Sequence, residues 1–465
     1  MISIDSYNTI IIGSGQGAYP LATELASKNL KVAVIEREKL GGTCINWGCT
    51  PTKTLYASAR VAHITKRASD YGVELGSTPS VNFSEVMKRK NKVVDIWHSG
   101  ITNNLEKNPN IDVLYGEGSF IDGRTVKVTK TSGEILEISG ERIVINTGAR
   151  SRVQEIEGLE TIDYLDNKKI LQLDSLPQHL VIIGGGYIAL EFGQMFQRFG
   201  SKVTIIQRSE RLLSREDNDI AEQVKEILES EGITVKVNSK VLKIKKLTEN
   251  NYSFTIDTNG TVEDIQGTHL LMAIGREPNS DMLNLEAAGV EVDEKGFIKT
   301  NEKLETTSES VYAIGDVKGG PAFTHISYDD FRILKNKWFG DGSRTIHNRS
   351  VPSTVFIDPQ LGRVGLNEKQ AKKKGISYDL YQMKMSSIAR AFEMDEQLGT
   401  LKVLVNPADQ TIIGTSVLGF EGGEIMNMLQ IAMEAKMSIN NLRDDVFAHP
   451  TLAEGFNNLF TYYKV

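Results

Sequence analysis

Both cysteines of this 465-residue chain lie in one glycine-flanked stretch, GGTCINWGCTPTK, where four residues separate Cys44 from Cys49. Cys49 comes just before a segment with helical spacing and Pro51 in its first turn. A thiol at a helix N-terminus lies in a positive field that favours the thiolate. The nearby glycines let the backbone bring the thiols together, so we expect a reversible disulfide. Two inert buried thiols are the alternative, which a close pair fits poorly.

Composition limits the classes of partner. The chain is 40% hydrophobic and 24% charged with a formal net charge of −7, as in an ordinary globular enzyme. It shows no basic excess for nucleic acid, and no polybasic run, signal peptide or long apolar segment for a membrane. We therefore expect a cytoplasmic protein, where a close cysteine pair is more often catalytic than structural. Two cysteines cannot close a four-coordinate zinc site, so no metal site is predicted.

The cysteine stretch follows a candidate phosphate-binding turn. An apolar strand, Thr9 to Ile12, runs into IIIGSGQGA, in which Gly13 and Gly15 let the backbone approach a pyrophosphate and Ala18 keeps the helix-packing position small. Glu36 ends the next strand, where a carboxylate can accept hydrogen bonds from ribose hydroxyls. A solvated surface acid is the alternative for Glu36.

The same order returns from Leu180 to Gln207, with Gly184, Gly186 and Ala189 in the turn. The second strand of this copy ends in Gln207 and Arg208 without an acid, and a guanidinium can bind a 2′-phosphate that a carboxylate would repel. The sequence therefore favours NADPH over NADH, although NADH stays possible. Two further arginines could assist, with ordinary surface charge an equally good interpretation: Arg211 and Arg215.

These repeats predict an α/β fold with two Rossmann-like dinucleotide-binding domains. Between them, Ile111 to Ile145 alternates β-formers with turns and predicts a small antiparallel meander that completes the first domain. From about Val351 onward, strands interleave with helices, which predicts a separate C-terminal α+β domain.

The motifs together resemble the class I pyridine nucleotide–disulfide oxidoreductases. GGTCxNxGCxPxK follows one GxGxxA turn, a second GxGxxA lies near residue 184, and HPTLAE lies near the C-terminus. The resemblance covers essentially the whole chain, in the order and spacing of that family, which includes dihydrolipoyl dehydrogenase and glutathione reductase. GGPAFTHISYDDFRI and VPSTVFIDPQLGRVGL are most similar to mercuric reductases and reactive-chlorine-resistance reductases.

The resemblance implies how the domains divide the work. FAD is expected in residues 1–148 and 273–345, NAD(P)H in residues 149–272, and the dimerisation interface in residues 346–465. A homodimer is expected, because in the family one subunit completes the active site of the other.

The resemblance also implies roles for cofactor-binding residues. Asp316 matches the acid that binds the flavin ribitol chain, and Lys53 matches the lysine beside the flavin ring, paired with Glu191. Tyr187 matches the residue that covers the flavin where nicotinamide docks; a core tyrosine with a satisfied hydroxyl is the alternative. The remaining implied contacts are Gly42, Thr43, Thr147, Gly148, Gly275 and Gly315.

Four residues carry the implied reaction. Cys49 matches the charge-transfer thiol facing the flavin, and Cys44 the interchange thiol that attacks the acceptor. His449 and Glu454 match the acid–base dyad, in which the carboxylate orients the imidazole to take the thiol proton. In the family, His449 precedes a proline bond that is often cis, and the dyad comes from the other subunit.

The predicted function is FAD-dependent transfer of electrons from NADPH through Cys44 and Cys49 to a small oxidised acceptor: a disulfide, an oxidised sulfur or hypohalous species, or a metal ion. Dihydrolipoyl dehydrogenase is the alternative enzyme, although Gln207 and Arg208 do not match an ordinary NAD-linked member. A redox-sensing flavoprotein is an alternative of another class, which would not need the dyad of His449 and Glu454.

Overall fold

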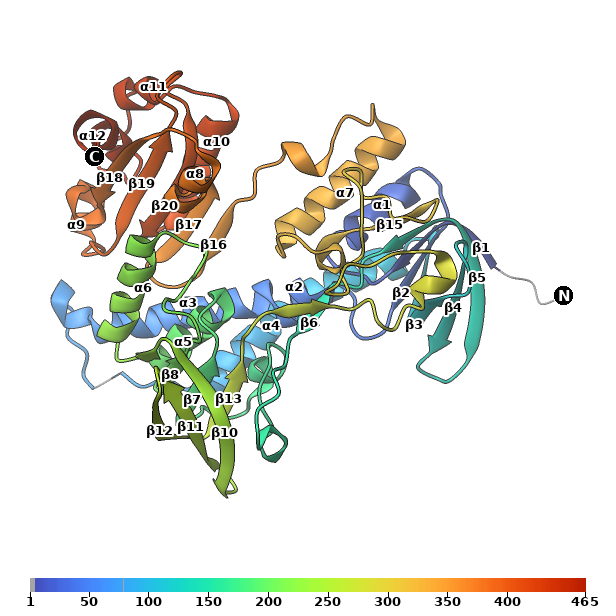
Figure 1. The fold of residues 1–465 in the computed structure, drawn as a ribbon, viewed down its shortest axis with the longest axis horizontal. Coiled ribbons are helices and arrows are strands. Elements are labelled where there is room, and N and C mark those ends of the chain that lie inside the picture. The colour runs from blue at the N-terminus through green and yellow to red at the C-terminus, as the bar shows by residue number, and fades with distance from the viewer. Residues whose placement is uncertain (1–4, 78) are drawn as a thin grey trace. The chain divides into compact units, whose positions relative to one another are not determined.

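The computed structural model describes residues 5–77 and 79–465, and its contacts divide the chain into two compact units (Figure 1). The first unit comprises Met1–Thr54, Met87–Arg152 and Gly275–Arg349. The second comprises Leu55–Val86, Val153–Ile274 and Ser350–Val465. The domain boundaries derived from the sequence stay a prediction. The chain passes from one unit to the other within a few residues of each predicted boundary. In addition, the segment 55–86 groups with the second unit.

A six-stranded sheet forms the centre of the first unit. Strands β3, β2, β1, β5 and β15 pair in parallel in that order, and β4 pairs antiparallel with both β3 and β5. The predicted antiparallel meander is therefore present but is not a separate sheet, because β3 and β5 also pair in parallel with the core strands. The strands are β1 (Asp5–Ile12), β2 (Val32–Glu36), β3 (Ile111–Phe120), β4 (Thr125–Lys130), β5 (Ile135–Ile145) and β15 (Val311–Ala313).

Helices cover one face of this sheet. Helix α1 (Ala18–Ser27) buries alanine and leucine side chains at the spacing of one helical face, among them Leu21 and Leu25, which pack near Phe331 of α7 (Thr324–Phe339). A second apolar core lies around Phe120 and Val126. The unit also contains α2 (Gly42–Trp47), the first turn of α3 (Cys49–Lys66), most of α4 (Phe83–Glu106), and the paired strands β6 (Ala149–Ser151) and β14 (Arg276–Pro278).

The second unit contains the repeated strand–turn–helix–strand element. Its parallel sheet has the order β13-β7-β8-β9, and an antiparallel sheet, β10-β11-β12, follows. The elements are β7 (His179–Ile183), α5 (Tyr187–Phe199), β8 (Lys202–Ile206), α6 (Asn218–Ser230), β9 (Thr234–Lys236), β10 (Ser239–Thr248), β11 (Asn251–Thr258), β12 (Thr261–Gly267) and β13 (His269–Met272).

The C-terminal part of the second unit is an antiparallel sheet of order β16-β17-β20-β19-β18 with helices. Helix α10 packs on β17 and β20 and buries Ile425, Met426 and Leu429. The elements are β16 (Ser353–Val355), β17 (Gln360–Gly365), α8 (Glu368–Lys374), β18 (Asp379–Lys384), α9 (Ala389–Glu393), β19 (Thr400–Val405), β20 (Ile412–Gly419), α10 (Gly422–Glu434), α11 (Ile439–Asp444) and α12 (Gly455–Tyr462).

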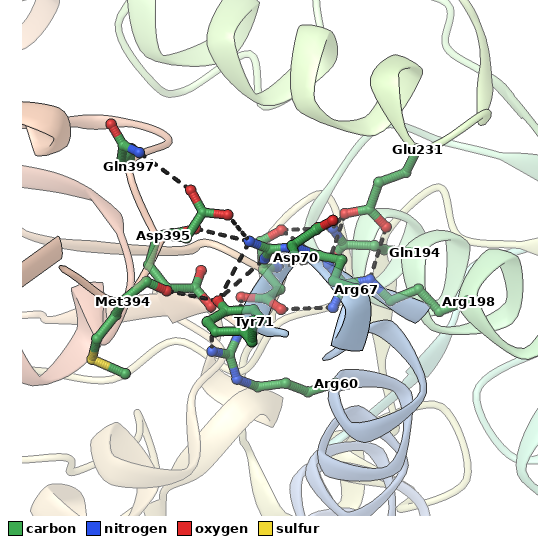
Figure 2. A network of polar contacts seen from close by, with 12 residues as sticks. Arg60, Arg67, Asp70, Tyr71, Gln194, Arg198, Glu231, Met394, Asp395 and Gln397 are labelled. Atoms are coloured by element: carbon green, nitrogen blue, oxygen red, sulfur yellow. Dashed lines mark hydrogen bonds and ion pairs between the residues drawn. The ribbon is translucent and has the colours of Figure 1, made fainter. Parts of the chain in front are cut away.

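A network of arginines and carboxylates stabilises the second unit (Figure 2). Arg198 of α5 bonds Asp358 and Glu231 at 2.7 Å each, and both Arg198 and Asp358 have only 5% of their side-chain surface exposed. Arg60 of α3 bonds the other oxygen of Asp358 at 2.5 Å and Glu396 at 2.9 Å. Removing one member of such a buried set typically costs about 3–5 kcal/mol. The network therefore fixes α3 and α5 against the loop at Asp358.

None of the helices among residues 5–77 and 79–465 is long and apolar enough to cross a membrane.

Candidate active site

The two cysteines lie in two consecutive helices, at positions that belong to the first unit. Cys44 is in α2 and half-buried, and Cys49 is exposed at the first position of α3, as the sequence predicted. No disulfide joins them in this structure. Gly42 begins α2 with φ +61°, and a Cβ there would lie 2.7 Å from the Cα of Gly15. The cysteine stretch therefore contacts the first phosphate-binding turn through two glycines, which leaves no room for a side chain.

The pKa of Cys44 is raised by its surroundings. A hydrogen bond with Cys49, burial and the Cys49 charge all raise the pKa of Cys44, and Thr324 and Lys53 oppose this rise. The surroundings of Cys44 therefore favour its protonated form. The N-terminus of α3 stabilises an anion at Cys49.

Thr324 is a site residue that the sequence analysis missed. Its hydroxyl lies 3.2 Å from the sulfur of Cys49, and it is the first residue of α7. A threonine at the start of a helix was a visible signal. Its contact with a residue 275 positions away was not, because only the tertiary fold brings the two helix starts together.

The first phosphate-binding turn has the predicted geometry. Gly13 has φ +93°, and a Cβ there would lie 2.5 Å from the carbonyl oxygen of Asn146. Glu36 accepts hydrogen bonds from Ser14, at 3.1 Å from the backbone N–H and 2.6 Å from the hydroxyl. Ala18 is fully buried under the turn. Glu36 is thus bound to the turn itself, which a merely solvated acid would not be.

The other residues predicted to contact FAD lie in the same unit. Asp316 is half-buried; desolvation raises its pKa against the effect of Arg276, whose guanidinium lies 3.3 Å away. Gly315 has φ +71° and donates its N–H to Asp330 at 2.8 Å. Arg276 and Asp330 were not predicted. An added Cβ would meet no atom within 4 Å at Gly148 or Gly275, and Thr43 and Thr147 are half-buried.

This set of residues fits a dinucleotide flavin. The open backbone at these glycines, the glycine turn in front of α1 and a half-buried carboxylate at Asp316 are the features that a pyrophosphate and a ribitol chain require.

The second turn repeats the first. Gly184 has φ +121°, and a Cβ there would lie 2.3 Å from the carbonyl oxygen of Ala273, while Ala189 is fully buried. Gly186 is exposed, and an added Cβ would meet no atom within 4 Å. Arg208, after the end of β8, is exposed. Of the two further arginines, Arg211 pairs with Glu210 next to it and Arg215 is exposed.

Tyr187 and Glu191 both lie on α5, which follows this turn. The Tyr187 hydroxyl donates to Glu216 at 3.3 Å and lies 3.5 Å from the Ser353 hydroxyl, and burial raises the pKa of Tyr187. Glu191 is buried and accepts a hydrogen bond from the backbone N–H of Phe356 at 2.9 Å. Lys53 belongs to the other unit, so its pairing with Glu191 stays a prediction.

The predicted acid–base dyad is assembled. Nδ1 of His449 lies 2.9 Å and 3.1 Å from the two carboxylate oxygens of Glu454. The His449–Pro450 bond is cis, as expected. His449 is 73% exposed and Glu454 only 18%, so the carboxylate fixes one ring nitrogen and the other is left for a proton transfer. A cavity of about 370 Å³ adjoins Glu454, next to Phe392 and Asn458.

Three acidic residues, Asp217, Asp219 and Glu368, come close enough together to suggest a cation site. The ammonium group of Lys402, only 1% exposed, lies 3.2, 2.9 and 2.6 Å from their respective carboxylates. Lys402 thus supplies the positive charge that this cluster needs, and the cluster is structural.

Comparison with known proteins agrees with this geometry. Residues 7–330 match the family model described as pyridine nucleotide-disulphide oxidoreductase, and residues 351–460 match its dimerisation domain. A probable pyridine nucleotide-disulfide oxidoreductase of Escherichia coli, RclA, is 37% identical over 99% of this chain and 100% of its own length. Mercuric reductase of Staphylococcus aureus is 34% identical over 97% of this chain and 81% of its own.

A solved structure supports the same relation. The HOCl-induced flavoprotein disulfide reductase RclA from Escherichia coli, as a Cu(II) complex, superposes with a TM-score of 0.90 at 37% identity, covering 98% of this chain and 99% of that one. Dihydrolipoyl dehydrogenase of Geobacillus stearothermophilus is 31% identical over 96% of this chain and 94% of its own.

Proposed function

This chain belongs to the pyridine nucleotide-disulphide oxidoreductase family, a family of FAD-dependent enzymes, and we propose that it is a homodimeric NADPH-dependent reductase of a small oxidised acceptor. Its electrons pass through Cys44 and Cys49. The dimerisation domain at residues 351–460 supports the homodimer. We place the enzyme in the cytoplasm, where the cysteine pair can be kept reduced.

The different positions of the two thiols, Cys44 within α2 and Cys49 at the start of α3 next to Thr324, are the observation that carries this proposal. Cys44 keeps its proton because Cys49 and burial raise its pKa, while Cys49 lies at the start of α3 beside Thr324. This is the division of labour that a two-step disulfide reductase needs: one thiol stabilised as an anion, and the other protonated until a base activates it.

The turn at Gly13 would bind one nucleotide, FAD, and the turn at Gly184 the other, NADPH. Gly13, Gly15 and the helix start at Ala18 would hold the pyrophosphate of FAD, with Glu36 on a ribose and Asp316 on the ribitol chain. When bound, FAD accepts a hydride from the reduced nicotinamide and supplies two electrons to the cysteine pair. Gly184 and Gly186 would hold NADPH, and Arg208 its 2′-phosphate.

His449 and Glu454 would handle the protons. In the homodimer, His449 of the partner subunit takes the Cys44 proton, the Cys44 thiolate attacks an acceptor disulfide, and the imidazolium returns the proton to the departing thiolate. The Cys49 thiolate then attacks the sulfur of Cys44, the mixed disulfide breaks, and the second thiol leaves with a proton from solvent. The acceptor gains two electrons and two protons, and Cys44 and Cys49 become a disulfide.

The acceptor class is a small disulfide, an oxidised sulfur or hypohalous species, or a metal ion. Two names support these alternatives: the related solved structure is described as HOCl-induced, and several relatives are mercuric reductases. Dihydrolipoyl dehydrogenase is the second candidate because a relative at 31% identity has that name. Arg208 at the end of β8 does not favour it. The assembled dyad does not favour a redox sensor.

An anaerobic titration of the purified protein with NADPH, and separately with NADH, tests the proposal. We expect a long-wavelength absorbance band after two electrons, from the Cys49 thiolate next to the flavin, and its loss in Cys49→Ser. Cys44→Ser should keep bound FAD and lose acceptor reduction. Bleaching of the flavin in the wild type without that band, or full turnover in Cys44→Ser, would contradict the cysteine mechanism.

A further inference from the structure

Glu216 is a buried carboxylate with an incomplete set of partners. It is only 1% exposed, and its Oε1 accepts hydrogen bonds from the Tyr187 hydroxyl and from Nη1 of Arg363, each at 3.3 Å. Among the described residues, its Oε2 and the Nε of Arg363 are buried without a hydrogen-bond partner. Burial raises the pKa of Glu216, and Arg363 opposes that rise.

The chain around Glu216 is held in place by the start of α8. Asn367 donates its side-chain amide to the carbonyl of Arg215 at 2.9 Å, and Lys369 bonds the carbonyl of Glu216 itself. The N–H groups of Glu368 and Lys369 each donate to Asp217 at 3.1 Å. Because its neighbours on both sides are fixed, the Glu216 side chain has little freedom to move toward water.

Arg363 is fixed as well. It lies on β17 of the C-terminal sheet, and its Nη2 donates to Gln370 at 2.6 Å. The pair of Glu216 and Arg363 thus joins the loop before α6 to the C-terminal sheet. The Tyr187 hydroxyl donates to the same oxygen of Glu216. Ser353 of β16, 3.5 Å from that hydroxyl, belongs to the same sheet.

A buried carboxylate with one unsatisfied oxygen gives little net stability by itself, since apolar residues of similar size would pack as well or better. We propose that Glu216 is a positioning residue for Tyr187, itself paired with the guanidinium of Arg363. Glu216 fixes the Tyr187 side chain at the first turn of α5. The strength of this contact thereby sets the free energy needed to move the Tyr187 ring out of its position. This inference rests on the proposed function and on the role that the resemblance implies for Tyr187, which is to cover the flavin where nicotinamide docks.

The physical consequence concerns nucleotide entry. Swinging the Tyr187 ring away breaks its hydrogen bond to a charged acceptor that water does not reach, and hydrogen bonds to charged groups are the stronger ones. Weakening this bond should make displacement easier. Nicotinamide would then bind more tightly, with little change in the rate of electron transfer once it is bound.

Stopped-flow reduction of the holoenzyme by NADPH under anaerobic conditions tests this, with four variants. Glu216→Gln removes the charge, Tyr187→Phe removes only the hydroxyl, and the double variant combines them. Glu226→Gln, on an exposed position of α6, is the matched control. We expect Glu216→Gln to lower the apparent Kd for NADPH by about threefold to tenfold while the limiting rate stays within about twofold. The double variant should match Tyr187→Phe, and Glu226→Gln should match the wild type.

Each other outcome overturns the inference. Additive effects of Glu216→Gln and Tyr187→Phe would show that the two residues act independently. A change in the limiting rate with an unchanged Kd, or melting at a lower temperature as the sole effect, would leave Glu216 a structural residue. If neither NADPH nor NADH reduced the wild-type flavin, the proposed function would fail together with this inference. If NADPH reduced the wild-type flavin and the Glu216→Gln variant showed the same Kd and limiting rate, only this inference would fail.

Discussion

The two glycine turns share one skeleton, and the strands that follow them end in different residues. In both, the first glycine has a positive φ, and an added Cβ would collide with a backbone carbonyl, at 2.5 Å from Asn146 in the first and 2.3 Å from Ala273 in the second. In both, an alanine packs the following helix onto the sheet. After the second strand, Glu36 bonds the first turn, whereas the second copy presents an exposed Arg208.

This difference separates two kinds of constraint. The glycines follow from sterics, because the strand next to the turn supplies a carbonyl that excludes any side chain. No such steric limit acts on the residue at the strand end. Its side chain can therefore differ between the two copies according to the ribose or phosphate that it would contact. The same backbone can therefore serve two nucleotides.

The largest expected effect comes from breaking the shared skeleton. Gly13→Ala should yield protein without bound FAD, because both its φ and the carbonyl of Asn146 oppose the new methyl group. Gly184→Ala should keep the yellow colour and lose about tenfold to hundredfold in kcat/KM for NADPH, through about 1–3 kcal/mol of strain at the nucleotide turn. Flavin content by absorbance and steady-state kinetics measure both.

Gly133→Ala is the matched control for these two substitutions. Gly133 also has a positive φ, +87°, but an added Cβ would meet no atom within 4 Å. Loss of FAD in Gly184→Ala but not in Gly13→Ala would show that the two turns had been assigned to the wrong nucleotides.

The next effect concerns the position where the two turns differ. Arg208→Glu should raise KM for NADPH by about tenfold to hundredfold and leave KM for NADH nearly unchanged, because a charge-assisted contact to the 2′-phosphate is replaced by repulsion. Steady-state kinetics with both nucleotides measure the ratio. Lys245→Glu, an exposed change of the same charge on β10, should leave both constants unaltered. Equal losses with the two nucleotides would remove the argument for NADPH.

The smallest effect compares the ion pairing near the two turns. Glu36 bonds within its own strand–turn–helix element, whereas Asp217, beside α6, pairs with the buried Lys402 of β19 together with Glu368. Burial acts to raise the pKa of Glu368, but the hydrogen bonds from Lys402 and Tyr378 together with the Lys402 charge outweigh it and lower that pKa to about 2. This depressed pKa contributes stability that is fully present above the ordinary value of 4.5 and is lost as pH falls toward 2.

Urea unfolding between pH 6 and pH 3 measures that contribution. The wild type should lose about 2 kcal/mol more than Lys402→Met over this range, because without Lys402 the Glu368 carboxylate gains little from staying ionised. Lys372→Met, which removes an exposed partner of Glu368, is the control and should follow the wild type. Parallel curves for the wild type and Lys402→Met would show that the pair adds no pH-dependent stability.

The sequence predicted the local parts of the site well. The helix start at Cys49, both glycine turns and the closeness of His449 to Glu454 follow from spacing within short segments, where backbone geometry leaves few alternatives. Local pattern also predicted the antiparallel pairing from Ile111 to Ile145. It missed that these strands extend the parallel sheet, because β1 and β5 are paired across more than a hundred residues.

What the sequence alone determined is the set of reactive groups: a cysteine pair at a helix start, two glycine turns with different strand ends, and a histidine next to a glutamate near the C-terminus. What only the tertiary structure decided is the environment that tunes this chemistry. Thr324 next to Cys49 and the pair of Glu216 and Arg363 behind Tyr187 join segments far apart in the chain. Pattern within a segment cannot specify such contacts, because they depend on how buried surfaces pack. Burial in turn raises the pKa values of Cys44 and Glu216.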